Sequence, residues 1–87
     1  GEIQCSTPEA RYPLAARRLG EQGTVRVRLV IDENGAVERA ELLSSSGSER
    51  LDRVALEAAQ ATRCRPYVAD GRPIRVTAVR PFSFRLD

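Results

Sequence analysis

The fold of this chain is decided by residues 25–37, which read VRVRLVIDENGAV. Apolar and polar side chains alternate from Val25 to Asp32, a pattern typical of a strand with one buried face. Glu33-Asn34-Gly35 then predicts a hairpin with a type I′ turn, because that turn needs positive φ at both central positions. The returning strand, residues 36–44, alternates less regularly, which predicts a β-bulge. An antiparallel strand pair is therefore the centre of the predicted fold.

A helix is predicted after this hairpin. Ser46 with Glu49 three residues later fits a capping box, and Ser48 is the alternative N-cap. The apolar positions that follow have helical spacing along one stripe, and Pro66 is expected to end the helix. The stripe comprises Leu51, Val54, Ala55, Ala58 and Thr62.

A last strand is expected from about Ile74 to Leu86, after a turn at Asp70-Gly71. Its apolar side chains share one parity, which only Arg80 interrupts. They are Ile74, Val76, Ala78, Phe82, Phe84 and Leu86. Because Pro81 cannot donate a hydrogen bond to a ladder, the strand is predicted to lie at the edge of the sheet.

The N-terminal residues complete the predicted order of elements. Residues 1–11 lack periodicity and predict an extended lead-in. A short helix is expected from Pro13, as its first residue, to a stop at Gly20. Its apolar contacts should come from Leu14, Ala15, Ala16 and Leu19. The predicted fold is α+β, in the order helix-strand-strand-helix-strand, with two helices packed on one face of a three-stranded antiparallel sheet.

The composition excludes most catalytic chemistry. The 87 residues make one domain with a net charge of +2, no His and 14 cationic residues, all of them Arg. Without His the chain lacks the commonest general base and metal ligand, and no nucleophile lies beside a base. The sequence therefore predicts no enzyme, no catalytic residue, no metal site and no cofactor.

The outer face of the predicted sheet is basic. Proteins that read nucleic acid on a sheet place aromatic side chains there for base stacking, but here both Phe residues have the inward parity. A solvated face is therefore favoured over a nucleic-acid site. The outer face carries Arg26, Arg28, Arg75 and Arg85.

The two cysteines leave two alternatives. Cys5 and Cys64 form one disulfide, or Cys64 is a small buried apolar residue. We favour the disulfide, which would close a loop of about 60 residues and stabilise the fold by up to about 4 kcal/mol. For a domain of this size that is a large fraction of the stability.

The exposed edge of the last strand also has two interpretations. An unpaired edge can bind an extended peptide as an additional strand. Alternatively, its charged and proline residues protect the edge against aggregation. From the residues alone both remain open; the protective set would be Arg75, Arg80, Pro81 and Arg85.

A series of short motifs extends over roughly residues 8 to 87. They are Tyr12-Pro13, Ala16-Arg17, Gly20, residues 23–27, 32–37 and 45–47, Leu51-Asp52, Ala55-Leu56, Arg65-Pro66, and residues 70–74 and 81–84. In their order and spacing these motifs resemble the TonB C-terminal domain family, and the resemblance places the domain at residues 12–87, after the lead-in at 1–11.

The resemblance implies a periplasmic domain of a protein anchored in the inner membrane of a Gram-negative bacterium. Such a domain follows a membrane helix and a long Pro-rich linker, and a proton-driven complex in the inner membrane powers it. It binds the TonB box, a short extended segment of an outer-membrane transporter, and transmits force for the uptake of nutrients such as iron chelates.

The family's binding residues are carried over by position. The last strand should supply the docking backbone, and residues 11–13 should flank the bound segment. The expected set is Arg11, Tyr12, Pro13, Arg75, Val76, Thr77, Ala78, Val79, Arg80, Phe82 and Phe84. Three positions depart from the family: Arg11 replaces a frequent glutamine, Thr62 a frequent tryptophan and Cys64 an aromatic residue. A disulfide at Cys64 could offset the lost aromatic packing.

Other functions remain as alternatives. A TolA-like envelope scaffold would share this fold and bind protein partners without energising transport. A basic nucleic-acid-binding module is the third alternative and would show salt-dependent DNA binding. Open strand edges also allow a homodimer by strand exchange.

Overall fold

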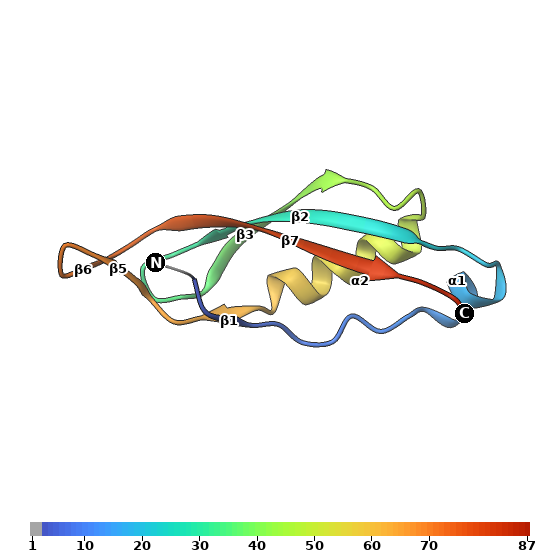
Figure 1. Cartoon of the computed structure of the whole chain (residues 1–87), viewed down its shortest axis with the longest axis horizontal. Helices are drawn as coiled ribbons and strands as arrows, with labels where there is room; N and C mark the ends of the chain where they lie inside the picture. The colour runs from blue at the N-terminus through green and yellow to red at the C-terminus, as the bar shows by residue number, and fades with distance from the viewer. Residues whose placement is uncertain (1–2) are drawn as a thin grey trace.

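A computed structural model describes residues 3–87 of the chain as an elongated body of 49 × 19 × 19 Å (Figure 1). The α+β fold and the three-stranded antiparallel sheet are confirmed. The elements are β1 (Cys5–Ser6), α1 (Leu14–Arg18), β2 (Gly23–Ile31), β3 (Val37–Ser44), α2 (Glu49–Gln60), β4 (Arg63–Cys64), β5 (Tyr67–Ala69), β6 (Arg72–Ile74) and β7 (Val76–Phe84).

The main sheet has the strand order β3-β2-β7, so β7 is an edge strand as predicted. β2 pairs with β7 without interruption, from Gly23 opposite Phe84 to Ile31 opposite Val76. Its register with β3 shifts twice, which confirms the irregularity predicted for the returning strand. β2 is therefore the only strand of this sheet with a partner on both sides.

The core lies between this sheet, α2 and the N-terminal segment. The inward side chains of β2 are almost completely buried, as their alternation predicts, and Leu51 and Ala55 of α2 pack against them. α2 crosses behind the sheet in Figure 1, while the segment between β1 and α1 runs along the other side of the helix. The inward residues of β2 are Val25, Val27, Leu29 and Ile31.

The turn between β2 and β3 differs from the prediction. Only Gly35 has positive φ there, +87°, so the turn is not type I′. The Asp32 carboxylate shapes it instead, because Oδ1 accepts the N–H groups of Asn34 (2.8 Å) and Ala36 (3.0 Å). Consecutive positive φ values occur at Asp70-Gly71, in the β5–β6 hairpin, where only a simple turn was predicted.

The ends of α2 correct two predictions. Ser48, the alternative cap, is the N-cap, and its hydroxyl accepts the N–H of Leu51 at 3.3 Å. The capping box of Ser46 and Glu49 is wrong, because the Ser46 hydroxyl bonds to Asp52 instead. The helix also ends at Gln60 rather than at Pro66, since β4 intervenes.

The first helix is shorter and more exposed than predicted. Pro13 is its N-cap, with extended ψ, rather than its first helical residue. Only Ala16 reaches the core; Leu14 and Leu19 are 61% and 65% exposed, because a five-residue helix directs little of its surface to one side. The predicted stop at Gly20 holds, with φ of +69°.

β4 ties the N-terminal segment to the rest of the fold. β1 pairs with β4, and a disulfide joins Cys5 to Cys64 across this pair, which confirms the favoured alternative for the cysteines. Farther along, the hydroxyls of Thr7 and Thr62 are hydrogen-bonded at 3.1 Å. On its other side, β4 meets the β2–β3 turn, where the Cys64 N–H donates to the Gly35 carbonyl at 2.8 Å.

The contact between Gly35 and β4 yields a prediction on stability. A Cβ at Gly35 would overlap the carbonyl oxygen of Cys64, whereas one at Gly71, with a similar φ of +78°, would meet nothing within 4 Å. Gly35→Ala should therefore destabilise the fold by about 3 kcal/mol or more, against about 1 kcal/mol for Gly71→Ala. Urea unfolding of both variants measures the difference in the free energy of unfolding. Equal decreases in the two variants would show that the close approach of Gly35 to β4 does not contribute to stability.

Candidate functional site

The open edge of β7 is the candidate site, because the sheet ends there with backbone groups that no strand among residues 3–87 pairs. In an antiparallel strand, the N–H and C=O of one residue point to the same side, and successive residues alternate. Pro81 lies opposite Arg26 and has no N–H to donate, which fits a residue whose backbone faces the open edge. The hydroxyls of Thr24 and Ser83, a pair of the same parity, lie 3.2 Å apart, as expected for a close, non-hydrogen-bonded pair.

This parity defines what the edge offers to a partner. Thr77, Val79 and Ser83 present both an N–H and a C=O, whereas Pro81 presents only its carbonyl. Their side chains are all exposed on the outer face of the sheet. The intervening side chains face the core side, half-buried from Val76 to Phe82 and buried at Phe84. An extended chain can thus pair most fully before Pro81, along Thr77 and Val79.

Tyr12 connects the two segments that the sequence predicted to bind a partner. Its ring meets the Phe84 ring edge-on, with centroids 5.5 Å apart, and the Arg17 guanidinium lies 5.0 Å from its centroid. Its hydroxyl donates to the Glu21 carbonyl oxygen. Tyr12 is therefore a half-buried packing residue that places its exposed neighbour, Arg11, near the end of β7.

Two residues that the sequence analysis did not single out fix this end of the molecule. The Glu21 carboxylate accepts the Ser48 hydroxyl at 2.7 Å and pairs with Arg50 at 3.1 Å, which joins the α1–β2 loop to the start of α2. The Gln22 side chain accepts the Leu86 N–H at 2.7 Å. Both contacts bridge long separations in sequence, so no local pattern indicates them.

The outer sheet face is less basic than its arginines suggest. Arg75 pairs with Glu38 at 3.1 Å and Arg28 with Glu41 at 3.9 Å. Exposed pairs of this kind contribute little stability, but they balance charge locally. Arg75, at the start of the predicted docking strand, is therefore engaged by a glutamate of β3.

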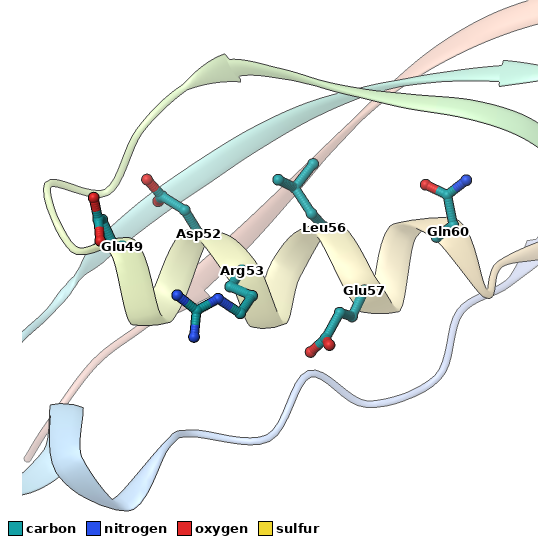
Figure 2. A pocket seen from close by; sticks show the side chains of 6 residues that line it. All are labelled: Glu49, Asp52, Arg53, Leu56, Glu57 and Gln60. Atoms are coloured by element: carbon teal, nitrogen blue, oxygen red, sulfur yellow. The ribbon is translucent and has the colours of Figure 1, made fainter.

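A second feature is a shallow hollow on α2, with a volume of about 550 Å³ (Figure 2). Asp52 and Leu56 point toward β3, while Arg53 and Glu57 point the other way. Asp52 is committed to the β3–α2 loop: it accepts the Ser45 hydroxyl at 2.5 Å and both the N–H (2.9 Å) and the hydroxyl (2.8 Å) of Ser46. The remaining lining residues are Glu49 and Gln60.

The described residues include no metal-ligand cluster, no unsatisfied buried side-chain polar atom and no membrane-spanning helix. Within residues 3–87, no group of three His, Cys, Asp or Glu side chains could hold a metal ion. No buried side-chain N or O atom in this part of the chain lacks a hydrogen-bond partner. None of its helices is long and apolar enough to cross a membrane. The backbone edge of β7 therefore remains the candidate site among the described residues.

The chain is similar in sequence to known proteins. The family model described as Gram-negative bacterial TonB protein C-terminal matches residues 8–86. The chain is 39% identical over 79 residues to protein TonB of Vibrio cholerae, covering 91% of this chain and 32% of that protein. It is 40% identical over 81 residues to protein TonB of Pseudomonas putida, covering 88% and 32%. The chain thus spans about a third of the length of these relatives.

A solved structure has the same fold. The solution NMR structure of the Pseudomonas aeruginosa TonB CTD superposes with a TM-score of 0.73 at 25% identity, covering 97% of this chain and 88% of that one. The two-helix, three-stranded arrangement is therefore shared with it.

The hydrogen bonds of Asp52 predict a pH dependence of stability. Partial burial raises the pKa of Asp52, but the bonds from Ser45 and Ser46 outweigh it and hold the pKa below the ordinary value of 3.8. A carboxyl with a depressed folded pKa stabilises the fold above its unfolded pKa, and this contribution is lost as the pH falls through the folded pKa. Asp52→Asn should therefore be less stable than the parent at pH 6, and the difference should shrink below about pH 4.

Thermal unfolding between pH 6 and pH 2.5 measures this difference. Glu57→Gln is the matched control, since Glu57 lies on the same helix and is exposed. If the difference between Asp52→Asn and the parent stayed constant down to pH 2.5, the carboxylate would not be what holds the β3–α2 loop.

Proposed function

The chain belongs to the family of Gram-negative bacterial TonB protein C-terminal domains, and on that premise we propose that it binds an extended peptide along the open edge of β7 and transmits force to it. The role is mechanical and non-enzymatic. The bound peptide is the TonB box of an outer-membrane transporter, and the force drives the uptake of nutrients such as iron chelates.

The observation that carries this proposal is the unpaired edge of β7. β7 is nine residues long and pairs along its whole length with β2, so its backbone is held in the extended conformation that a second strand on the other side would need. A peptide that adds a strand gains main-chain hydrogen bonds with little dependence on its side chains. The segment around Arg11 and Tyr12 lies at the Phe84 end, where it would flank the bound peptide.

The compartment proposed is the periplasm, with the domain tethered to the inner membrane through a preceding linker and driven by a proton-powered complex. The Cys5–Cys64 disulfide supports this proposal, because disulfides persist in oxidising compartments such as the periplasm.

The same disulfide supports the transmission of force. A pull on the N-terminal side reaches Cys5 and passes through the covalent bond to Cys64. From there only the β5–β6 hairpin separates the load from β7. Without the bond, the load would travel through residues 6–22 into β2, and only noncovalent contacts would resist detachment of that segment. These are the two-residue β1–β4 pair, the Thr7–Thr62 hydrogen bond and the packing of Tyr12 and Ala16 against the core.

Peptide binding can be tested by backbone methylation. An N-methyl group removes a donor and blocks strand pairing at that residue, and a paired strand presents every second residue to its neighbour. We expect TonB-box peptides methylated on one parity to lose binding by at least about tenfold, while those methylated on the other parity keep it. NMR titration of the labelled, oxidised domain would place the shifts at residues 75–84 and 11–13.

Two outcomes would contradict β-augmentation. Equal binding of both methylated peptides would show that the peptide does not pair through its backbone. If no transporter peptide bound at millimolar concentration, a scaffold that binds other envelope proteins would replace the proposal.

Single-molecule pulling tests the force path. The domain is held by its N-terminus and by a peptide bound to β7, and the oxidised domain should reach rupture without an intermediate step. After reduction, residues 6–22 should detach first and release a segment with a contour length on the order of 55 Å, so that the added extension is this length less the distance that the folded segment already spans. The Cys5→Ser variant, pulled without reductant, should behave like the reduced domain; identical traces in all three cases would exclude a mechanical role for the bond.

A further inference from the structure

Arg80 is the one charged side chain on the core-facing side of β7. It lies opposite Val27, which is fully buried, and between Ala78 and Phe82 along its own strand. The residue is half-buried, and its neighbours on this face pack against the core. A charged group at such a position loses part of its hydration, so a partner for its guanidinium is expected.

No such partner exists among residues 3–87. The arginines that face glutamates form ion pairs, at Arg28, Arg39, Arg50 and Arg75. Arg17 stacks on Tyr12 and Arg63 donates to a carbonyl oxygen. Arg80 has no hydrogen bond, ion pair or aromatic contact with any described residue, although it lies closer to the core than most of them.

Its position on the strand directs it toward the docking edge. Residues of the Arg80 parity bond their backbones to β2, so a peptide on the open edge would meet Arg80 in a non-hydrogen-bonded position if it ran antiparallel. Side chains in such pairs are the closest across two strands, with Cβ atoms about 4.5–5.5 Å apart. The peptide residue opposite Arg80 would also place its side chain on the core-facing side.

The charge of the docking strand favours an acidic residue there. Residues 71–86 contain four arginines and no Asp or Glu, namely Arg72, Arg75, Arg80 and Arg85. Arg75 is already paired with Glu38. A carboxylate is the group that both matches the free guanidinium in charge and accepts its parallel N–H donors.

We propose that Arg80 selects peptides with an Asp or Glu at the position directly opposite it, on the core-facing side of β7. The inference rests on peptide binding at this edge and adds the side-chain specificity that backbone pairing lacks. The carboxylate would lie partly shielded from water by the side chains around Arg80, which strengthens the pair relative to one on an open surface.

The test is a peptide scan with a double-mutant cycle. A single Glu is moved through an otherwise neutral extended peptide, and each peptide is compared with its Gln counterpart by isothermal titration calorimetry. With the parent domain, one position should bind about fivefold more tightly as Glu than as Gln, and this preference should weaken in high salt. Arg80→Gln should abolish the preference.

Arg85→Gln is the matched control, because it removes the same charge from the residue just after β7, on the opposite parity and exposed. It should keep the preference. Arg80→Glu should reverse it, so that Lys replaces Glu as the favoured residue at that position. Amide NMR spectra of the variants establish that each retains the fold.

The outcomes separate this inference from the proposed function. If the parent domain binds the peptides but never distinguishes Glu from Gln, or if Arg80→Gln keeps the preference, the assignment of Arg80 is wrong while peptide binding stands. A third outcome is that the Arg80→Gln variant self-associates while its preference for Glu over Gln is unchanged. Arg80 would then only prevent aggregation at the edge of β7, and the inference would be wrong. If no peptide binds the parent domain, both fall together.

Discussion

A two-residue strand pair, closed by a disulfide, fixes where the N-terminal segment crosses the core. β1 and β4 have too few backbone hydrogen bonds to persist alone, so the Cys5–Cys64 bond keeps them together. From this point the chain passes Thr62 and reaches Tyr12, whose ring packs on Phe84 at the far end of β7. β4 also supports the β2–β3 turn through Gly35. One short strand thus links the lead-in, the helix end and the central hairpin.

The sequence predicted best where one physical rule operates alone. The alternation of β2 and β7 follows from burial on one face, and Pro81 at an edge follows from its missing N–H. The alternation shows which side chains of β7 face the core, and Pro81 shows that the strand lies at the edge of the sheet. Together they indicate which backbone groups of β7 remain unpaired.

The predictions failed where a longer contact overrode a local signal. Asn34-Gly35 has the residues of a type I′ turn, but the Asp32 carboxylate and the approach of β4 impose another geometry. Ser46 and Glu49 have the spacing of a capping box, but Asp52 takes the Ser46 hydroxyl. In both cases a carboxylate accepts hydrogen bonds from groups that the predicted motif would have used in another way. The spacing of the residues in the sequence does not indicate that this carboxylate lies close to them.

In the proposed function, the edge of β7 meets two demands that the sequence left open. A strand that accepts a transient partner needs free backbone groups, and those same groups invite aggregation. Pro81 removes one donor and shortens the stretch over which an unwanted strand could pair, while Thr77 and Val79 keep theirs. On the role proposed for it, Arg80 makes the core-facing side of the edge unfavourable for an apolar strand and favourable for an acidic one. The same residues would then serve both protection and recognition. Pro81 limits where an incoming strand can form backbone hydrogen bonds, and Arg80 limits which side chain that strand can place opposite it.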